Sequence, residues 1–588
     1  MSYRLSARDE EQKREPLGKA IGRMLPLMLQ ERRNIAIALG AVTVTSAATL
    51  ASPYIIGQTV DHFIAHGDYS GVIGNAAILL AIYLVSLVTS YVQTRTMGGV
   101  GRRILFNLRN ALFTKLQELP VAFFNQNRAG DLISRINNDT DKLNQFFAQA
   151  LMQFLSNGFL IVGSGILLVT LNFRLGGAAL LPALAVLIIT QVISGWVKRA
   201  NFTSLQTLGG LSGEIQESLA NFKVIVAFNR LDYFRGKFRA ANETNYNASI
   251  RAGIANNVFV PLYGLAYNIA QLIVLAFGIW MITAGDLTTG LLIGFLLYVN
   301  NFYNPLRQLA TAWSSLQLAL AALDRISEVM ALGNDMPLLP AAKPAAAAKA
   351  PLLEFDSVSF GYAEGQHVLD DVSLRLERGK TYALVGPTGG GKTTTASLMA
   401  RLYDPKSGVV RFDGRDIRTI SPEERAQRVG FILQEPFLFT GTVRGNIVYG
   451  NDALKTVGDA ELTQILEARG LATLLARFEQ GLETPVKSSG DSISLGQKQL
   501  IAFIRAVLRD PELLILDEAT ANIDTVTEQL LEEILAKLPK ATTKVIIAHR
   551  LNTISNADEI FFVNGGTVTE AGSMEHAVDM LLHGAMAS

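Results

Sequence analysis

A glycine-rich loop carries the clearest chemistry in this 588-residue sequence. It reads Leu-Val-Gly-Pro-Thr-Gly-Gly-Gly-Lys-Thr-Thr-Thr from Leu384 to Thr395. Glycines let a backbone wrap closely around phosphate oxygens, so that the N–H groups of the loop and of the next helix point at them. The Lys392 ammonium can then reach the β- and γ-phosphates, and the Thr393 hydroxyl can bind Mg²⁺. We therefore expect a nucleoside triphosphate to bind at Gly386, Pro387, Thr388, Gly389, Gly390, Gly391, Lys392, Thr393 and Thr394.

A pair of carboxylates adds hydrolysis to this prediction. Asp517 and Glu518 end the apolar run Leu513-Leu514-Ile515-Leu516. Asp517 at a strand end can hold Mg²⁺, usually through water, and Glu518 can orient or deprotonate an attacking water. A strand followed by Asp-Glu is common by itself, and the phosphate loop upstream makes it specific.

An α/β domain is expected to position these residues. The phosphate loop lies between a strand-like run, Thr381 to Val385, and a helical run, Thr393 to Leu402. Other short β-rich runs alternate with helical stretches from residue 352 onward, which favours a largely parallel sheet. These runs are Leu353 to Phe360, Val429 to Leu433, Leu513 to Leu516, Lys544 to Ala548 and Glu559 to Val563.

The uneven distribution of apolar residues indicates that the chain has a membrane part in addition to this domain. Only 18% of the residues are charged, 49% are hydrophobic, and the apolar excess lies before about residue 320. The net charge of +1 gives no argument for a nucleic-acid partner. The absence of cysteine excludes disulfides and thiolate metal sites, and the 6 histidines are spread along the chain.

Six uncharged, mostly apolar stretches precede the α/β region. Each is long enough to cross a membrane, which takes about 20 helical residues. Six in succession favour membrane spans over buried helices of a soluble protein. The stretches are Asn34 to Val60, Gly71 to Thr94, Leu143 to Phe173, Leu175 to Val197, Ala252 to Gly285 and Leu287 to Leu306.

Basic residues between the spans predict their orientation. The segments before the first span, after the second and after the fourth are rich in Lys and Arg, whereas the other connections carry almost none. By the positive-inside rule, the N-terminal segment, both long connections and everything after the sixth span are cytoplasmic. Residues 1–33 also lack the features of a signal peptide. We expect an integral protein in contact with membrane lipid, in a bacterial inner (plasma) membrane.

Both long cytoplasmic connections are predicted to be helical extensions of the spans, because apolar residues recur at helical spacing. Aromatic residues lie at their far ends, Phe123 and Phe124 in the first and Phe228, Tyr233 and Phe234 in the second. Exposed aromatics there suggest docking onto another domain, although a locally packed hairpin is the alternative.

The linker from Gly333 to Pro351 is rich in Ala and Pro. The predicted organisation is therefore a cytoplasmic segment (1–33), an all-α six-helix membrane domain (34–330), a linker (331–351) and an α/β P-loop NTPase domain (352–588).

One further stretch identifies a family resemblance. Ser492-Ile493-Ser494-Leu495-Gly496-Gln497 opens a helical run through Leu508 and resembles the Leu-Ser-Gly-Gly-Gln signature of ATP-binding cassette (ABC) proteins. The resemblance implies that adenine stacks on Tyr362, that Asp524 lies in the loop after the carboxylates, and that His549 is the switch histidine. It also implies catalytic roles for Gln434, Glu518 and His549, and Mg²⁺ binding by Thr393, Gln434 and Asp517.

The membrane half is similar to that of the exporter type. Phe123-Phe124, Gly130-Asp131, Ser134-Arg135 and Asn138-Asp139 resemble the first cytoplasmic loop of that type. The resemblance implies that two such subunits pair, and that each ATP lies between the phosphate loop of one subunit and the signature residues of the other, here Ser494, Leu495, Gly496 and Gln497.

The signature departs from the family pattern at Leu495, where the family has glycine, and Ser488 stands where exporters usually have glutamate. An isobutyl side chain would separate the N–H groups of the helix start from a γ-phosphate. Lys392, Asp517, Glu518 and His549 all match. We therefore favour a heterodimer over a homodimer, with a partner half-transporter that supplies an intact signature but lacks a glutamate at the position matching Glu518.

The substrate is not identified by the sequence. The later spans carry aromatics such as Tyr263, Tyr267 and Phe302, which could line a cavity or face lipid and neighbouring helices. We favour ATP-driven export of a hydrophobic small molecule, such as a drug or lipid. An exporter-shaped importer of a metal chelate and an ATP-gated channel remain alternatives.

Overall fold

The computed structural model describes residues 3–5, 17–340, 350–363, 365–434, 436–487, 493–517, 525–547, 557–572 and 574–583. The chain forms two compact units. One comprises residues 1–5, 118–129 and 332–588, and we call it the α/β unit. The other comprises residues 6–117 and 130–331, and we call it the helical unit.

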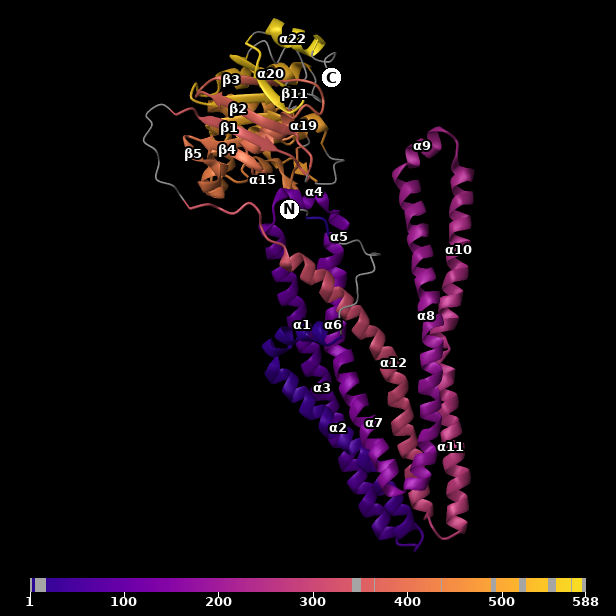
Figure 1. Ribbon diagram of the computed structural model, residues 1–588. Helices are drawn as coiled ribbons and strands as arrows, with labels where there is room; N and C mark the ends of the chain where they lie inside the picture. Colours follow the sequence, from indigo (N-terminus) through magenta and orange to yellow (C-terminus); the bar gives the residue numbers. More distant parts are fainter. Residues whose placement is uncertain are drawn as a thin grey trace. The chain divides into compact units, whose positions relative to one another are not determined.

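Two main sheets form the α/β unit (Figure 1). The first has the order β12-β11-β3-β10-β9-β6, and its neighbours pair in parallel except β11 with β12. Its strands are β3 (Thr381–Val385), β6 (Val429–Ile432), β9 (Leu513–Asp517), β10 (Thr543–Ile547), β11 (Glu559–Asn564) and β12 (Thr567–Glu570). The predicted parallel sheet is therefore present.

The second sheet is antiparallel and was not predicted. Its order is β2-β1-β4-β5, with β1 (Leu353–Phe360), β2 (Leu369–Leu376), β4 (Ser407–Phe412) and β5 (Arg415–Asp416). The strand predicted at Leu353 to Phe360 belongs here, because the short connection between β1 and β2 permits an antiparallel pair but not a parallel crossover. A third, two-stranded sheet pairs β7 (Gly441–Thr442) with β8 (Pro485–Val486).

Strand β9 shows how the core of the α/β unit is arranged. All five of its residues are buried. Leu513 and Ile515 pack in one hydrophobic cluster with β1 and α13, whereas Leu514 and Leu516 pack in another with α19 and α20. Side chains of a strand alternate between its faces, so β9 must be apolar throughout to be covered on both.

The α/β unit also contains helices of 3 to 13 residues, most of which connect its strands. They are α4 (Val121–Gln126), α13 (Lys392–Met399), η4 (Ile417–Thr419), α14 (Pro422–Arg428), α15 (Val443–Ile447), α16 (Asp452–Lys455), α17 (Asp459–Ala468), α18 (Ala472–Leu475), η5 (Gly481–Glu483), α19 (Leu495–Val507), α20 (Thr525–Lys537) and α22 (Met574–His583). Helix α4 comes from the first long connection of the membrane half, and its place in this unit agrees with the docking predicted for Phe123 and Phe124.

Helices of 5 to 50 residues make up the helical unit. They are α1 (Leu17–Gln30), α2 (Arg32–Gln58), η1 (Thr59–Ile64), α3 (Tyr69–Glu118), α5 (Ala129–Ser134), η2 (Arg135–Asp139), α6 (Thr140–Gln145), η3 (Phe146–Ala150), α7 (Leu151–Leu171), α8 (Phe173–Ala220), α9 (Phe222–Ala227), α10 (Leu231–Asn257), α11 (Phe259–Thr283) and α12 (Thr289–Ala331). At 50 and 48 residues, α3 and α8 are far longer than the roughly 20 residues that a bilayer requires.

Among the described residues, 5 helical segments are long and apolar enough to cross a membrane. They lie within Arg32–Ile64, Tyr69–Glu118, Ala129–Leu171, Phe173–Ala220 and Leu231–Thr283. They contain the first, second and fourth predicted spans, and the third and fifth except for the last two residues of each, because those spans were predicted to end at Phe173 and Gly285. The sixth predicted span, Leu287 to Leu306, begins two residues before α12 and otherwise lies in its first half, which is not among the 5, so it stays a prediction.

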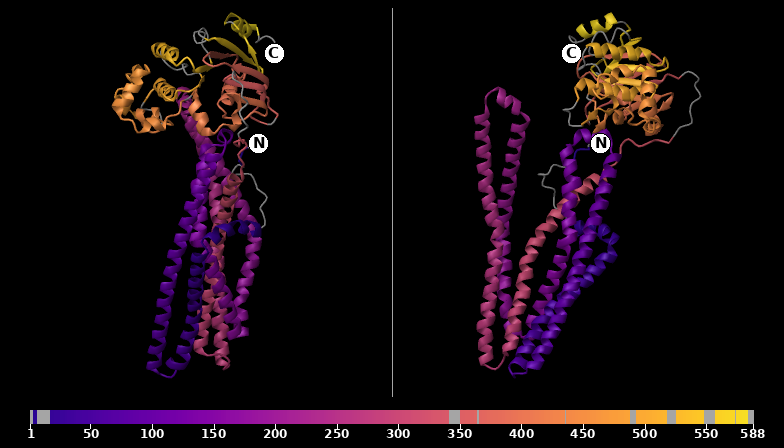
Figure 2. Two further views of the ribbon diagram at one scale, coloured as in Figure 1. Left: turned by 90° about the vertical axis from the view of Figure 1, so that its left-hand side faces the viewer. Right: turned by 180° about the vertical axis from the view of Figure 1, so that it is seen from behind.

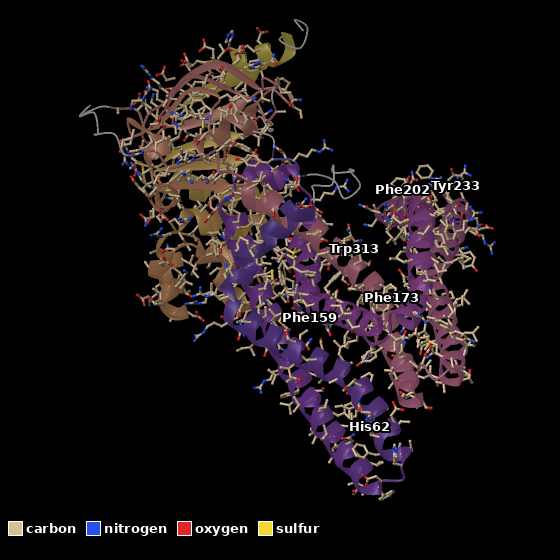
Figure 3. The ribbon with its side chains drawn as sticks, turned by 60° about the horizontal axis from the view of Figure 1, so that its bottom comes forward. His62, Phe159, Phe173, Phe202, Tyr233 and Trp313 are labelled. Carbon is tan, nitrogen blue, oxygen red and sulfur yellow. The ribbon has the colours of Figure 1, made fainter. Side chains whose placement is uncertain are left out.

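Helices α8 and α10 run side by side as a hairpin in both views of Figure 2. The side-chain amides of Asn201 and Asn256 exchange two hydrogen bonds, of 2.9 and 3.0 Å, between these helices. Helix α9 joins the pair, and its neighbour Phe228 is 75% exposed. Figure 3 labels two further exposed aromatic side chains, Phe202 on α8 and Tyr233 on α10. Of the three aromatics predicted at the end of the second connection, Phe228 and Tyr233 are therefore exposed in this chain, whereas Phe234 is half-buried.

Candidate active site

The glycine-rich loop joins β3 to α13. Gly386, Gly389 and Gly391 have φ values of 148°, 83° and 113°, which only glycine adopts readily. A Cβ at Gly386 would lie 2.0 Å from the Val563 carbonyl oxygen of β11, and one at Gly390 would lie 2.5 Å from it. The tight wrap of the loop against β11 therefore requires glycine at both positions.

The side chain of Lys392 crosses the loop. It is 5% exposed, and its Nζ donates to the carbonyl oxygens of Gly386 and Pro387 at 2.7 and 2.9 Å. Lys392 is also the first residue of α13, whose N-terminal end carries partial positive charge. The ammonium and the helix end thus attract an anion to the same place, as triphosphate binding requires.

Parallel pairing gathers the other candidate residues around this loop. Leu384 in β3 and Asp517 in β9 both pair with Ile547 in β10, so these three residues are level across the sheet. Ile432 in β6 pairs with Leu516 in the same sheet. Since parallel strands end at one edge, the phosphate loop after β3, Asp517 at the end of β9 and the chain after β6 and β10 all start from that edge.

The structure describes some of the predicted catalytic residues at this edge but not all. Asp517 is the last residue of β9 and is 3% exposed. Gln434 is exposed and lies two residues after the end of β6. Glu518, Asp524 and His549 lie outside the described residues, although Glu518 directly follows Asp517 in the sequence and His549 comes two residues after β10.

Tyr362 places an aromatic face beside the loop. Its hydroxyl shares a 3.0 Å hydrogen bond with Oγ1 of Thr394 in α13. Its ring is 45% exposed and meets the ring of Tyr403 edge-on at 5.2 Å. An exposed ring fixed next to a phosphate loop suits the stacking of a base. Tyr403 packs against Tyr362. This role was not predicted from the sequence, because Tyr403 lies in a loop without a recognisable motif.

The described residues fit ATP and Mg²⁺ as bound groups. The loop and Lys392 would take the phosphates, and Thr393 and Asp517 would supply oxygen ligands to Mg²⁺, which prefers such ligands and keeps several waters. No group of three or more His, Cys, Asp or Glu within the described ranges could hold a metal by itself.

The signature residues begin a capped helix. Oγ of Ser494 accepts from the Gln497 N–H at 3.2 Å, and Oε1 of Gln497 accepts from the Ser494 N–H at 2.9 Å. This capping box satisfies two N–H groups and leaves those of Leu495 and Gly496 at the helix start. Leu495 is 41% exposed, so its side chain stands at the surface beside them.

Arg505 of α19 is a further residue that sequence patterns missed. Its guanidinium donates to the Phe437 carbonyl at 3.1 Å and to the Asn446 carbonyl at 2.8 Å. Asn446 is 1% exposed and in turn bonds both backbone groups of Phe439. Burial lowers the pKa of Arg505. The segment that follows Gln434 is therefore fixed to the signature helix.

The motif residues of the first cytoplasmic loop form an ion network in the helical unit. Arg135 is 1% exposed and pairs with Asp131 at 3.0 Å and with Glu328 of α12 at 2.7 Å. Arg325 of α12 pairs with Asp131 at 2.5 Å and with Asp139 at 3.1 Å. The motif thus ties α5 and η2 to the end of α12, which leads into the linker.

Comparisons with known proteins agree with this architecture. The family model described as "ABC transporter transmembrane region" matches residues 35–306, and the model described as "ABC transporter" matches residues 369–521. A fatty acid ABC transporter ATP-binding/permease protein of Mycobacterium tuberculosis is 31% identical over 554 residues, which are 94% of this chain and 86% of that protein. A multidrug resistance ABC transporter ATP-binding and permease protein of Lactococcus lactis is 30% identical over 538 residues, or 90% of this chain and 88% of that protein.

A solved structure of a bacterial Atm1-family ABC exporter with ATP bound superposes with a TM-score of 0.76 and 25% sequence identity, covering 95% of this chain and 98% of that one. The order of the two regions along the chain agrees with these matches. The chain is a member of the ABC transporter family, with a transmembrane region followed by an ATP-binding domain in one polypeptide.

Proposed function

We propose that this chain is the ATP-hydrolysing subunit of a heterodimeric ABC exporter for hydrophobic or amphipathic compounds. The observation that supports it most is the common edge of β3, β10, β9 and β6, from which the phosphate loop, Asp517 and the segments leading to Glu518, His549 and Gln434 all start. In this proposal Lys392 holds the phosphates, Thr393, Gln434 and Asp517 bind Mg²⁺, and His549 contacts the γ-phosphate.

Glu518 is proposed as the general base that activates water. The change Glu518→Gln keeps the size of the side chain but removes its basicity, so ATP should still bind while turnover falls by about 100-fold or more. ATP hydrolysis and nucleotide binding by purified protein in lipid measure the two effects. Glu559→Gln is the matched control, because Glu559 pairs with Lys380 at the opposite edge of the sheet. Ordinary hydrolysis by Glu518→Gln would refute this role.

The heterodimer is proposed because the phosphate loop of this chain matches the family pattern whereas its signature does not. The loop has its glycines and Lys392 in place, whereas Leu495 stands at the exposed start of α19. In a homodimer both ATP sites would face Leu495. In a heterodimer only the partner's phosphate loop would face it, and this chain's loop would face an intact signature.

The chain purified alone tests this pairing. We expect little substrate-stimulated ATP hydrolysis from it, and a rise when Leu495 is replaced by Gly or by Ala. Leu495→Ala removes the bulk without the helix penalty of glycine, which is about 1 kcal/mol. A homodimer of the unchanged chain with full substrate-stimulated hydrolysis would contradict the heterodimer.

The substrate class is proposed from the membrane half and from the relatives' names. Tyr267, Phe302 and other aromatics lie on α11 and α12, and the two relatives are named for fatty acids and multidrug resistance. Inside-out vesicles should accumulate a fluorescent lipid or a hydrophobic dye only with hydrolysable ATP. Movement in the opposite direction would indicate an importer, and a current that persists with bound nucleotide would indicate a channel.

A further inference from the structure

The segment Tyr3-Arg4-Leu5 packs within the α/β unit, far along the sequence from its neighbours there. Tyr3 is 2% exposed and Leu5 is 8% exposed, whereas Arg4 between them is exposed. This alternation is that of an extended chain with one face buried. We call these three residues the N-terminal strap.

The strap is hydrogen-bonded to the end of α4. The Tyr3 N–H donates to Oε1 of Gln126 at 2.8 Å, and the Leu5 N–H donates to Oδ1 of Asn127 at 3.0 Å. Nδ2 of Asn127 donates to the carbonyl oxygens of Tyr3 and Phe123, both at 2.8 Å. Backbone groups buried without partners are costly, so these bonds fix the strap in one register against α4.

The Tyr3 side chain extends the contact to the start of the linker. Its ring meets Phe123, which is fully buried, at 6.4 Å and edge-on. Its hydroxyl donates to the Gly333 carbonyl at 3.3 Å and accepts from the Asp335 N–H at 3.1 Å. Burial, assisted by Asp335, raises the pKa of Tyr3 to about 12.

A second contact of α4, made by Asn125, connects the helix to the candidate ATP site. Nδ2 of Asn125 donates to the Tyr403 hydroxyl at 2.6 Å, and the Tyr403 ring supports Tyr362, whose hydroxyl reaches Thr394. Helix α4 and its C-terminal neighbour Asn127 therefore contact the strap, which in turn contacts the linker start through Tyr3. Asn125 of the same helix contacts the aromatic pair beside the phosphate loop.

We propose that the N-terminal strap is a positioning element for transport: Tyr3 and Leu5 hold α4 against the linker start, so that Asn125 stays on Tyr403 and nucleotide binding beside Tyr362 moves α4. In the sequence α4 lies between α3 and α5, so its displacement is passed to the helical unit through the chain itself. This inference rests on the ATP-driven transport of the family but not on the identity of the partner or of the substrate.

Thiol labelling tests whether the strap is docked, independently of activity. The chain contains no cysteine, so single-cysteine variants report one position each. In membranes without nucleotide, maleimide should label Leu5→Cys at least about tenfold more slowly than the matched control Arg4→Cys, because position 5 is buried and position 4 is exposed. Adding Asn127→Ala to Leu5→Cys should remove most of this protection. Equal labelling of the two single-cysteine variants would overturn the proposal.

Coupling is tested with Tyr3→Ala and Tyr3→Phe in the complete transporter. Tyr3→Ala should lower the number of substrate molecules moved per ATP by about tenfold, with the KM for ATP and the basal hydrolysis rate unchanged. Tyr3→Phe keeps the ring against Phe123 but loses the bonds to residues 333 and 335, and it should lie between Tyr3→Ala and the unchanged protein. Normal coupling in Tyr3→Ala, or a loss of basal hydrolysis in parallel, would show that the strap does not position α4 for transport.

Discussion

At the scale of single residues, the phosphate loop combines strict backbone demands with one buried positive charge. Gly386 and Gly390 face the Val563 carbonyl at distances that exclude a side chain. Lys392 is held by carbonyl groups of its own loop, which are neutral acceptors. A triphosphate offers negatively charged acceptors to the same ammonium, so that the attraction between opposite charges is added to the hydrogen bonds.

Replacing Lys392 by Ala should therefore weaken ATP binding by about 10- to 100-fold, or about 1.4 to 2.8 kcal/mol. Titration with a fluorescent ATP analogue measures the affinity. Lys380→Ala removes the same charge at the other end of β3, where Lys380 pairs with Glu559, and should leave the affinity unchanged. Equal effects of the two changes would mean that overall charge, and not the loop, governs binding.

At the scale of elements, two ion networks hold helices and strands together. One is the network of Arg135 and Arg325 with the carboxylates of α5, η2 and α12. Arg135 itself is buried, and it also donates to the Arg325 carbonyl at 2.6 Å. Each hydrogen bond to a charged group typically contributes about 1.5 to 3 kcal/mol, so removing Arg135 removes several such contributions.

Arg135→Ala should accordingly lower the thermal stability of the detergent-purified protein much more than Arg128→Ala does. Both changes remove one positive charge, but Arg128 is exposed whereas Arg135 is 1% exposed. Thermal unfolding followed by light scattering or a dye measures the difference. Similar unfolding temperatures for the two variants would show that the network adds no stability.

The other network joins the two sheets of the α/β unit. Arg428 donates to Glu512, which precedes β9, at 2.6 Å and to Asp413, which follows β4, at 3.0 Å. The hydrogen bond from Arg428 lowers the pKa of Glu512, while burial acts in the opposite direction. A carboxyl group with a lowered pKa stabilises the fold above its unfolded pKa of about 4.3, and this contribution is lost as the pH falls through the folded pKa.

Arg428→Met should therefore lower the unfolding temperature near pH 7, and the gap to the unchanged protein should narrow below about pH 4. Part of the gap should persist at low pH, because Arg428 also lies over the Phe412 ring at 4.7 Å. Unfolding curves between about pH 7 and pH 3.5 provide the test, with Arg411→Met at an exposed ion pair as the control. A gap that does not change with pH would contradict the role of Glu512.

At the scale of the whole molecule, the helical unit presents a large apolar surface. None of the most apolar window in α3 is buried, and large side chains such as Leu87 and Leu80 are 67% and 60% exposed. Water would make such a surface unfavourable at roughly 25 cal/mol for each Å² of apolar area, whereas lipid covers it. The helices therefore require a membrane.

We expect the protein to remain with the membrane pellet after washes with high salt and with alkaline carbonate, and to be released by detergent. These washes remove proteins that are bound only by charge or by peripheral contacts. Immunoblots of pellet and supernatant follow the distribution. Release by carbonate alone would contradict the assignment of the spans.

The sequence by itself determined the features that depend on local order along the chain. Glycines, Lys392 and Thr393 between a strand and a helix, apolar runs of membrane length, and Asp517 at a strand end are all local patterns, and the structure has the loop and the strands where these patterns predict them. The bounds differ slightly, because α13 ends at Met399 and not at Leu402.

Only the tertiary structure decided which distant residues meet. The antiparallel sheet, the support of Tyr362 by Tyr403, the partners of Arg135 on α12 and the docking of Tyr3 on α4 join residues that are far apart in the sequence or carry no motif. Such contacts depend on how buried surfaces fit and how buried polar groups find partners, and neither has a fixed spacing along the chain.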